Sequence, residues 1–144
     1  MKIRALMLSA ALLAGCAAPA GVPFPHVIGR VDPFEIVLDR RDGVFSYTVS
    51  CLWSQPYQSY EVDVATSDAA GGMAARGGTI GEPGAPPARC DPSSPLFAPT
   101  IIPGALRDGQ YLRVTLRVTR ADGSAKVLRR TYRQENGGLR LEQP

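Results

Sequence analysis

Residues 34–53 read FEIVLDRRDGVFSYTVSCLW, and the spacing of their apolar side chains predicts two antiparallel β-strands. From Phe45 to Cys51 every second residue is apolar, and Ser or Thr stands between them. A period of two places successive side chains on opposite faces of a strand, so one face is buried and the other is polar. Asp42-Gly43 joins the two runs and is typical of a tight hairpin turn. These residues therefore predict a β-hairpin with one buried face.

The same alternation predicts further strands, at residues 60–64, 111–120, 124–133 and 139–142, with one more around 96–102. The run at 124–133 is less regular, because Leu128 shares its parity with Lys126, and we expect a bulge or an edge position there. No segment has a sustained helical period. Six or seven short antiparallel strands predict an all-β fold, a small two-sheet β-sandwich; a small closed β-barrel is the alternative.

The N-terminal segment has the features of an export signal. Lys2 and Arg4 precede an uncharged run of 10 residues, from Ala5 to Ala14, that is mostly Ala and Leu. A membrane-spanning helix needs about 20 apolar residues, so this run is too short to be one. A positive start, a short apolar run and small residues before a cleavage site are typical of a signal peptide.

Leu13-Ala14-Gly15-Cys16 resembles the lipobox of bacterial lipoprotein precursors. The resemblance implies that residues 1–15 are a lipoprotein signal peptide and that the Cys16 thiol carries a diacylglyceryl thioether. The new N-terminus is commonly acylated with a palmitate-type chain, and two or more chains make a stable membrane anchor. The absence of Asp at residue 17 implies outer-membrane sorting, with the domain facing the periplasm. An ordinary signal peptide cut nearby is the alternative.

The mature chain divides into a tether and one domain. Residues 16–33 combine the lipidated Cys16 with a Pro-rich stretch, which we expect to act as a semi-rigid spacer. Residues 34–144 are expected to form a single β-sandwich domain. Within it, residues 67–95 are rich in Gly, Ala and Pro, with almost no large apolar residue, and predict a long loop.

The chain has three cysteines, an odd number for an exported protein. Lipidation of Cys16 leaves Cys51 and Cys90, and an oxidising compartment favours a disulfide between them. Closing a loop of this length stabilises a fold by roughly 4 kcal/mol at most. The alternative is two separate thiols.

Residues 106–123, LRDGQYLRVTLRVTRADG, resemble the penultimate hairpin of many Ig-like or fibronectin-like domains. In those domains a Tyr follows a tight turn and leads into a core strand, so the resemblance implies an Ig-like sandwich. Tyr111 departs from the pattern, because its parity is opposite to that of Leu112 and Val114. We therefore expect no buried tyrosine corner here.

The sequence offers no constellation of catalytic residues. His26 is the single histidine and falls in the predicted tether, and none of the common nucleophile, metalloprotease or phosphate-loop motifs occurs. We therefore predict a non-enzymatic protein, with no cofactor and no metal site.

Removing Lys2 and Arg4 with the signal takes the 16 basic residues to 14, against 13 acidic residues, so the mature net charge is +1. The distribution is uneven, because residues 107–144 hold 9 basic and 4 acidic side chains. A basic strand face could contact anionic lipid head groups or an acidic protein. A solvated face partly neutralised by the protein's own acids is the alternative. The candidate residues are Arg113, Arg117, Arg129 and Arg130.

Aromatic residues cluster at WSQPYQSY, residues 53–60. Parity predicts that Trp53 and Tyr60 are core residues, and that Tyr57 is exposed and could stack on a sugar ring. The function that we predict is a membrane-tethered interaction or assembly module, anchored in lipid through Cys16, with an envelope protein as its partner and no nucleic acid. The alternative is a ligand-binding module that holds a cell-wall glycan or inhibits a periplasmic enzyme.

Overall fold

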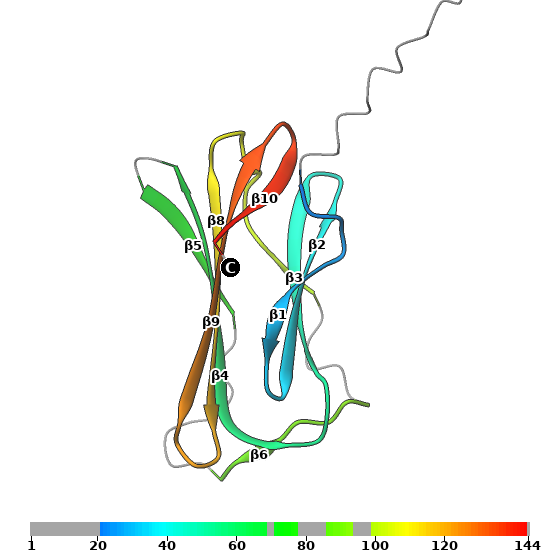
Figure 1. Cartoon of the computed structure of the whole chain (residues 1–144), viewed down its shortest axis with the longest axis vertical. Coiled ribbons are helices and arrows are strands. Elements are labelled where there is room, and N and C mark those ends of the chain that lie inside the picture. Colours follow the sequence, from blue (N-terminus) through cyan, green and yellow to red (C-terminus); the bar gives the residue numbers. More distant parts are fainter. Residues whose placement is uncertain (1–20, 69–70, 78–85, 94–98, 144) are drawn as a thin grey trace, which may run out of the picture.

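The computed structural model describes residues 21–68, 71–77, 86–93 and 99–143, which form two antiparallel β-sheets packed face to face (Figure 1). The sheets do not close into a barrel, so the predicted all-β sandwich is confirmed and the barrel alternative is wrong. The described residues contain ten strands rather than six or seven. No helix capable of crossing a bilayer occurs among them.

The smaller sheet has the strand order β1-β2-β3-β7. Its strands are β1 (His26–Val31), β2 (Phe34–Arg41), β3 (Val44–Cys51) and β7 (Thr100–Ile101). The larger sheet has the order β10-β9-β8-β4-β5, and the short β6 pairs with the first residues of β4. Its strands are β4 (Pro56–Asp68), β5 (Gly71–Gly77), β6 (Ala88–Arg89), β8 (Tyr111–Arg120), β9 (Ala125–Glu135) and β10 (Gly138–Gln143).

The hairpin predicted at residues 34–53 is confirmed. β2 and β3 pair without interruption from Phe34 opposite Cys51 to Arg41 opposite Val44. The two turn residues, Asp42 and Gly43, have φ angles of 52° and 76°. Positive φ at both positions defines the turn whose twist matches that of the flanking strands, and Asp-Gly is a favoured pair for it.

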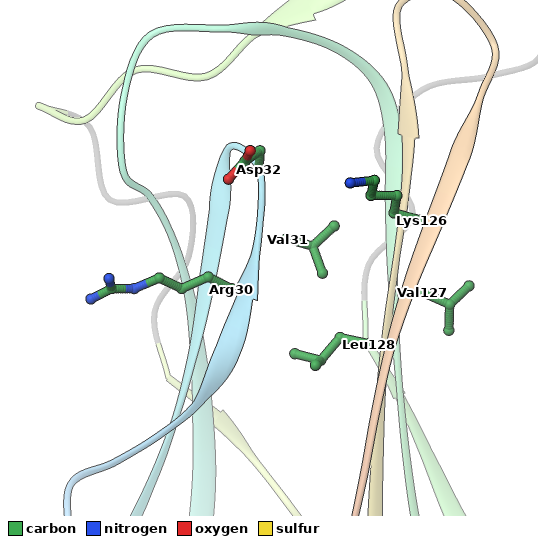
Figure 2. Close-up of a pocket in the computed structure, with 6 residues that line it drawn as sticks. All are labelled: Arg30, Val31, Asp32, Lys126, Val127 and Leu128. Carbon is green, nitrogen blue, oxygen red and sulfur yellow. The ribbon is translucent and has the colours of Figure 1, made fainter. Parts of the chain in front are cut away.

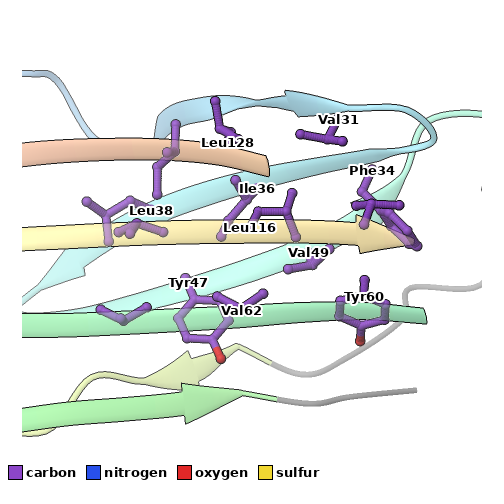
Figure 3. Packing of buried hydrophobic residues seen from close by; sticks show 14 of the residues in the cluster. Val31, Phe34, Ile36, Leu38, Tyr47, Val49, Tyr60, Val62, Leu116 and Leu128 are labelled. Atoms are coloured by element: carbon purple, nitrogen blue, oxygen red, sulfur yellow. The ribbon is translucent and has the colours of Figure 1, made fainter. Parts of the chain in front are cut away.

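The core lies between the sheets and is built from the alternating side chains that the sequence predicted. Phe34, Ile36 and Leu38 of β2 are fully buried, as are the inward residues of β8. Figure 3 shows Ile36 and Leu38 within the same layer as Leu116, which comes from the opposite sheet. Both sheets therefore exclude water through one face and leave the other face available for contacts.

The prediction of a tether that runs to residue 33 is wrong over its second half. Residues 26–31 form β1, which pairs with β2 along the edge of the smaller sheet. Upstream of β1, the Val22 N–H donates a hydrogen bond of 2.7 Å to the Leu139 carbonyl. A shift in register between Val27 and Gly29 breaks the alternation of apolar residues, which is why periodicity did not reveal this strand.

The predicted long loop at residues 67–95 is also partly wrong. β4 continues to Asp68, and β5 pairs with it from Gly71 to Gly77. β6 pairs with the other end of β4, at Pro56 and Tyr57. Residues 78–85 of the predicted loop lie outside the described residues. Backbone pairing at a sheet edge needs no large side chains, so a Gly- and Ala-rich sequence gave no apolar signal for it.

The predicted disulfide is confirmed. Cys51 at the end of β3 is bonded to Cys90, and their Cα atoms are 5.6 Å apart. The bond joins a core strand of the smaller sheet to the residue that follows β6, which belongs to the larger sheet. Cys90 is fully buried, and its N–H donates to the Gln55 carbonyl. The two sheets are therefore linked covalently at one end of the sandwich.

Candidate interaction surface

The outer face of the larger sheet carries a group of arginines on β8, β9 and β10. Directly opposite residues in antiparallel strands project to the same side of a sheet, so the register identifies the residues that share this face. Tyr111 lies opposite Arg133, and Arg133 lies opposite Arg140 of β10. We call this part of the outer face the arginine face; its arginines are Arg113, Arg117, Arg129, Arg133 and Arg140.

Three of these arginines form a compact triangle. Thr115 of β8 lies opposite Arg129 of β9, so Arg129 is the diagonal neighbour of both Arg113 and Arg117. Diagonal neighbours across a strand pair are roughly 7–8 Å apart. None of the ion pairs among the described residues involves any of the three guanidinium groups. Their charge is therefore available to an external anion.

The remaining two arginines of the face are partly neutralised. Arg133 and Arg140 both approach the Glu135 carboxylate, with N–O distances of 3.4 and 3.6 Å. The Arg133 guanidinium also lies over the Tyr111 ring, 5.7 Å from its centroid, within the range of a cation–π contact. These contacts fix the side chains of Arg133 and Arg140 near β10. The guanidinium groups of the triangle form no ion pair within the described residues.

Acidic residues continue the same outer face on β4. Glu61 lies opposite Arg117, and Asp63 lies opposite Thr115. Neither carboxylate forms an ion pair with an arginine of the face within the described residues. The outer face of the larger sheet therefore changes from acidic on β4 to basic on β8, β9 and β10.

A hollow of about 470 Å³ lies on this outer face where the acidic and basic parts meet. Asp63, Tyr111, Arg113 and Thr131 contribute to its lining. The Asp63 Oδ1 atom is buried and accepts no hydrogen bond from any of the described residues. The hollow brings a carboxylate, a guanidinium and an aromatic ring together, and these groups can orient a polar ligand.

Arg130 does not belong with the other predicted arginines, and its grouping with them is wrong. It lies opposite Val114, a buried residue, so its side chain starts from the inner side of β9. As a residue it is half-buried, and its guanidinium donates an exposed hydrogen bond to the Arg129 carbonyl. Consecutive strand residues project to opposite faces, so Arg129 and Arg130 cannot both face outward.

The aromatic predictions at residues 53–60 are wrong for two residues of three. Tyr57 is only 3% exposed and packs edge-on against Phe34, 4.9 Å between centroids, so it cannot stack on a sugar. A register shift between Tyr57 and Ser59 reverses the parity and turns Tyr57 inward, on the same side as Tyr60. Trp53 is 43% exposed, because it lies beyond the end of β3. Tyr60 is a core residue, as predicted.

A second hollow, of about 290 Å³, opens between the β1–β2 hairpin and β9 (Figure 2). Val31 and Leu128 project into it, whereas Arg30 points away from it and Val127 lies on the far side of β9. Asp32 and Lys126 stand at its rim and form no ion pair with each other. Its floor is part of the core, and Asp32 and Lys126 are the charged residues at its rim.

His26 and Tyr132 form a polar contact that sequence reasoning missed, because His26 was assigned to a tether. The His26 Nε2 atom is 2.9 Å from the Tyr132 hydroxyl, and the two rings meet edge to face. Burial lowers the pKa of His26 below its ordinary value of 6.5 and raises the pKa of Tyr132 to about 12. Both groups are therefore neutral near pH 7, and the contact is structural.

No group of three or more His, Cys, Asp or Glu side chains able to hold a metal ion occurs in the described part of the chain. Comparison of the chain with family models, curated proteins and solved structures found no match. The argument for function therefore depends on the residues themselves.

Proposed function

We propose that the chain is a lipid-anchored, non-enzymatic module of a bacterial cell envelope that acts by contact with its neighbours from the membrane surface. The anchor is the acylated Cys16, and Ala17 favours the outer membrane with the domain in the periplasm. The partner is an envelope protein. The surfaces available for contact are the outer faces of the two sheets.

One observation carries this proposal: the folded domain begins almost directly after the lipobox-like cysteine. Val22 already bonds to β10, and Phe24 packs against Phe45 with 5.9 Å between ring centroids. Five residue steps separate Cys16 from Gly21, and a chain spans at most about 3.6 Å per residue. A lipid on Cys16 would therefore hold the start of the domain within about 18 Å of the bilayer surface.

Such a short connection supports a function through proximity. A module confined to a membrane surface meets its neighbours at a much higher effective concentration than a free protein, without any new contact. The spacer that we expected to lift the domain away from the lipid is far shorter than residues 16–33. Partners at or close to the bilayer surface are therefore favoured over partners far from the membrane.

Site-specific photo-crosslinking in intact cells tests this function. We would place the crosslinker at Thr48 on the outer face of the smaller sheet, at Thr115 on the arginine face and at Ser124 in the β8–β9 turn. At one or more positions we expect a single envelope protein in stoichiometric yield. The Cys16→Ser protein should give at least tenfold less product, because tethering is lost. An equal yield from the unanchored protein, or no product at all three positions, would contradict the proposal.

A second candidate function is ligand binding in the hollow beside the arginine face. The observation that favours it is that the Asp63 carboxylate, the Tyr111 ring and the Arg113 guanidinium line one hollow. Sugars present hydroxyl donors and an apolar ring face that suit such a site. Retention on purified peptidoglycan that is lost with Asp63→Asn and Tyr111→Ala, but kept with Thr48→Ala, would support it. No retention of the wild type would exclude this candidate.

A further inference from the structure

We propose that the arginine face lies against the anionic lipid head groups of the membrane that holds the anchor. This inference deepens the proposed function, on which its anchored form rests, by assigning the membrane as the partner of one face. The domain would then lie on its larger sheet, with the smaller sheet exposed to envelope proteins.

The charge of the face is the first argument. The three strands that hold its five arginines carry two acids, the exposed Glu142 and Glu135, which is shared by Arg133 and Arg140. Within the described residues, no guanidinium of the triangle of Arg113, Arg117 and Arg129 forms an ion pair, although Glu61 of β4 lies opposite Arg117. Basic groups held near an anionic lipid surface are attracted to it over about one Debye length.

The residues between the arginines are the second argument. Val127 lies opposite Arg117 and is 55% exposed, and Tyr111 is 37% exposed on the same face. A Tyr ring and an aliphatic side chain among arginines suit the boundary between head groups and acyl chains, where aromatic residues are enriched.

The position of the chain entry is the third argument. The Val22 N–H bonds to the Leu139 carbonyl, so the chain enters the domain beside β10, at the edge of the larger sheet. Figure 1 shows β10 beside β9, and β8, β9 and β10 are the strands that carry the arginines. Strands are about 4.8 Å apart and residues about 3.3 Å apart along a strand, so the register places Arg113 roughly 14 Å and Arg117 roughly 25 Å from Leu139. A connection of at most about 18 Å lets the arginine face reach the bilayer.

The outer face of the smaller sheet also exposes apolar residues, Val44 and Ile101, but its positive charges are paired. Arg30 is paired with Glu35 at 2.6 Å, and Arg41 with Asp39 at 3.3 Å. Its central strand β3 presents Ser46, Thr48 and Ser50. This face has no excess of positive charge, so an anionic membrane would select the other one.

Quenching of tryptophan fluorescence by brominated lipids measures which face contacts the membrane. The full mature protein would be reconstituted in vesicles of 70% phosphatidylethanolamine and 30% phosphatidylglycerol, with Trp53→Phe to remove the native fluorophore. Val127→Trp then reports on the arginine face, and Thr48→Trp reports on the outer face of the smaller sheet. We expect strong quenching at residue 127 and little at residue 48.

Substitution of the triangle provides the matched test. Arg113→Gln with Arg117→Gln and Arg129→Gln should abolish quenching at residue 127 while the protein stays on the vesicles. As the control, three Arg→Gln substitutions at Arg30, Arg41 and Arg89, all outside the arginine face, should leave the quenching at residue 127 unchanged. Raising the salt concentration from 0.1 to 1 M shortens the Debye length from about 10 to about 3 Å. It should therefore also abolish quenching at residue 127, as substitution of the triangle does.

The exported Cys16→Ser protein separates this inference from the anchor. It should still bind the same anionic vesicles, more weakly, and should lose about fivefold in affinity for each arginine of the triangle removed. Binding that ignores the triangle, equal quenching at residues 48 and 127, or no quenching at either, would overturn the inference even if Cys16 is lipidated. A triangle-dependent crosslink to an acidic protein without lipid quenching would overturn it in favour of that partner. A missing lipid on Cys16, with intact vesicle binding, would overturn only the proposed anchor.

Discussion

The Nε2 atom of His26 lies 2.9 Å from the Tyr132 hydroxyl, although 106 residues separate the two in the sequence. This contact joins the first strand of the smaller sheet to the inner side of β9 in the larger sheet. It shows that the residues before Phe34 belong to the domain.

His26 should make the stability of the protein depend on pH. Burial lowers its pKa in the folded state, whereas the unfolded chain keeps a value near 6.5. Below pH 6.5 the unfolded state therefore binds more protons, and the free energy of unfolding falls until the folded pKa is passed. As the pH falls through this window, the free energy of unfolding of the wild type should decrease relative to that of His26→Phe. Urea unfolding at pH 7.5, 6.0 and 5.0 measures it; a constant difference would contradict the prediction.

Ile28 should contribute to the core as a strand residue does. It is 5% exposed, and the substitution Ile28→Ala should lower the free energy of unfolding by about 2–4 kcal/mol. Its neighbour Val27 is 46% exposed, so Val27→Ala should change stability by about 0.5 kcal/mol or less. Chemical denaturation of both variants measures the difference. If both substitutions had equally small effects on the free energy of unfolding, residues 26–31 would be part of the tether and not a core strand.

Gly29 should be required by the close approach of β9. A Cβ atom at this position would lie 2.6 Å from the Leu128 Cδ2 atom, well inside van der Waals contact. Gly29→Ala should therefore cost about 1–3 kcal/mol, the usual range for overpacking a core. In a Leu128→Ala background the same change should be neutral or stabilising, because the space is then free. A double-mutant cycle by thermal unfolding shows this coupling; additive effects would exclude the steric explanation.

The disulfide should supply a substantial part of the stability. Cys51 and Cys90 are 39 residues apart, and closing a loop of this length contributes about 2–4 kcal/mol. Reduction should lower the urea midpoint of the wild type and leave a Cys51→Ala, Cys90→Ala variant unchanged. The same midpoint for the oxidised and reduced wild type would mean that the bond is not constraining the unfolded chain.

The sequence predicted those strands in which a regular alternation survives. β2, β3 and β8 show it because each lies between the core and solvent along its whole length. β1 was missed because Gly29 and a register shift interrupt the pattern, and β5 because it has no run of large apolar residues. Local periodicity reports burial of side chains, and it carries no signal for backbone pairing at a sheet edge.

The regular alternation along β8 also predicted part of the candidate site. Arg113 and Arg117 were recognised as outward residues of β8, and Arg129 faces the same side across the register. The sequence prediction placed Arg130 with them, although Arg129 and Arg130 are consecutive and consecutive strand residues project to opposite faces. The exposure of Tyr57 depended on a bulge that no composition rule predicts, and the hollow at Asp63 depends on side chains brought together by three strands.

The state of residue 16 tests the central claim most directly, because both the tethering and the short reach of the domain depend on it. Intact-mass and N-terminal peptide analysis of the protein purified from membranes would measure it. Our account predicts a chain that begins at Cys16 and carries acyl groups, and a Cys16→Ser chain that carries none. A wild-type chain with an unmodified Cys16 thiol, or one cut elsewhere, would contradict the account.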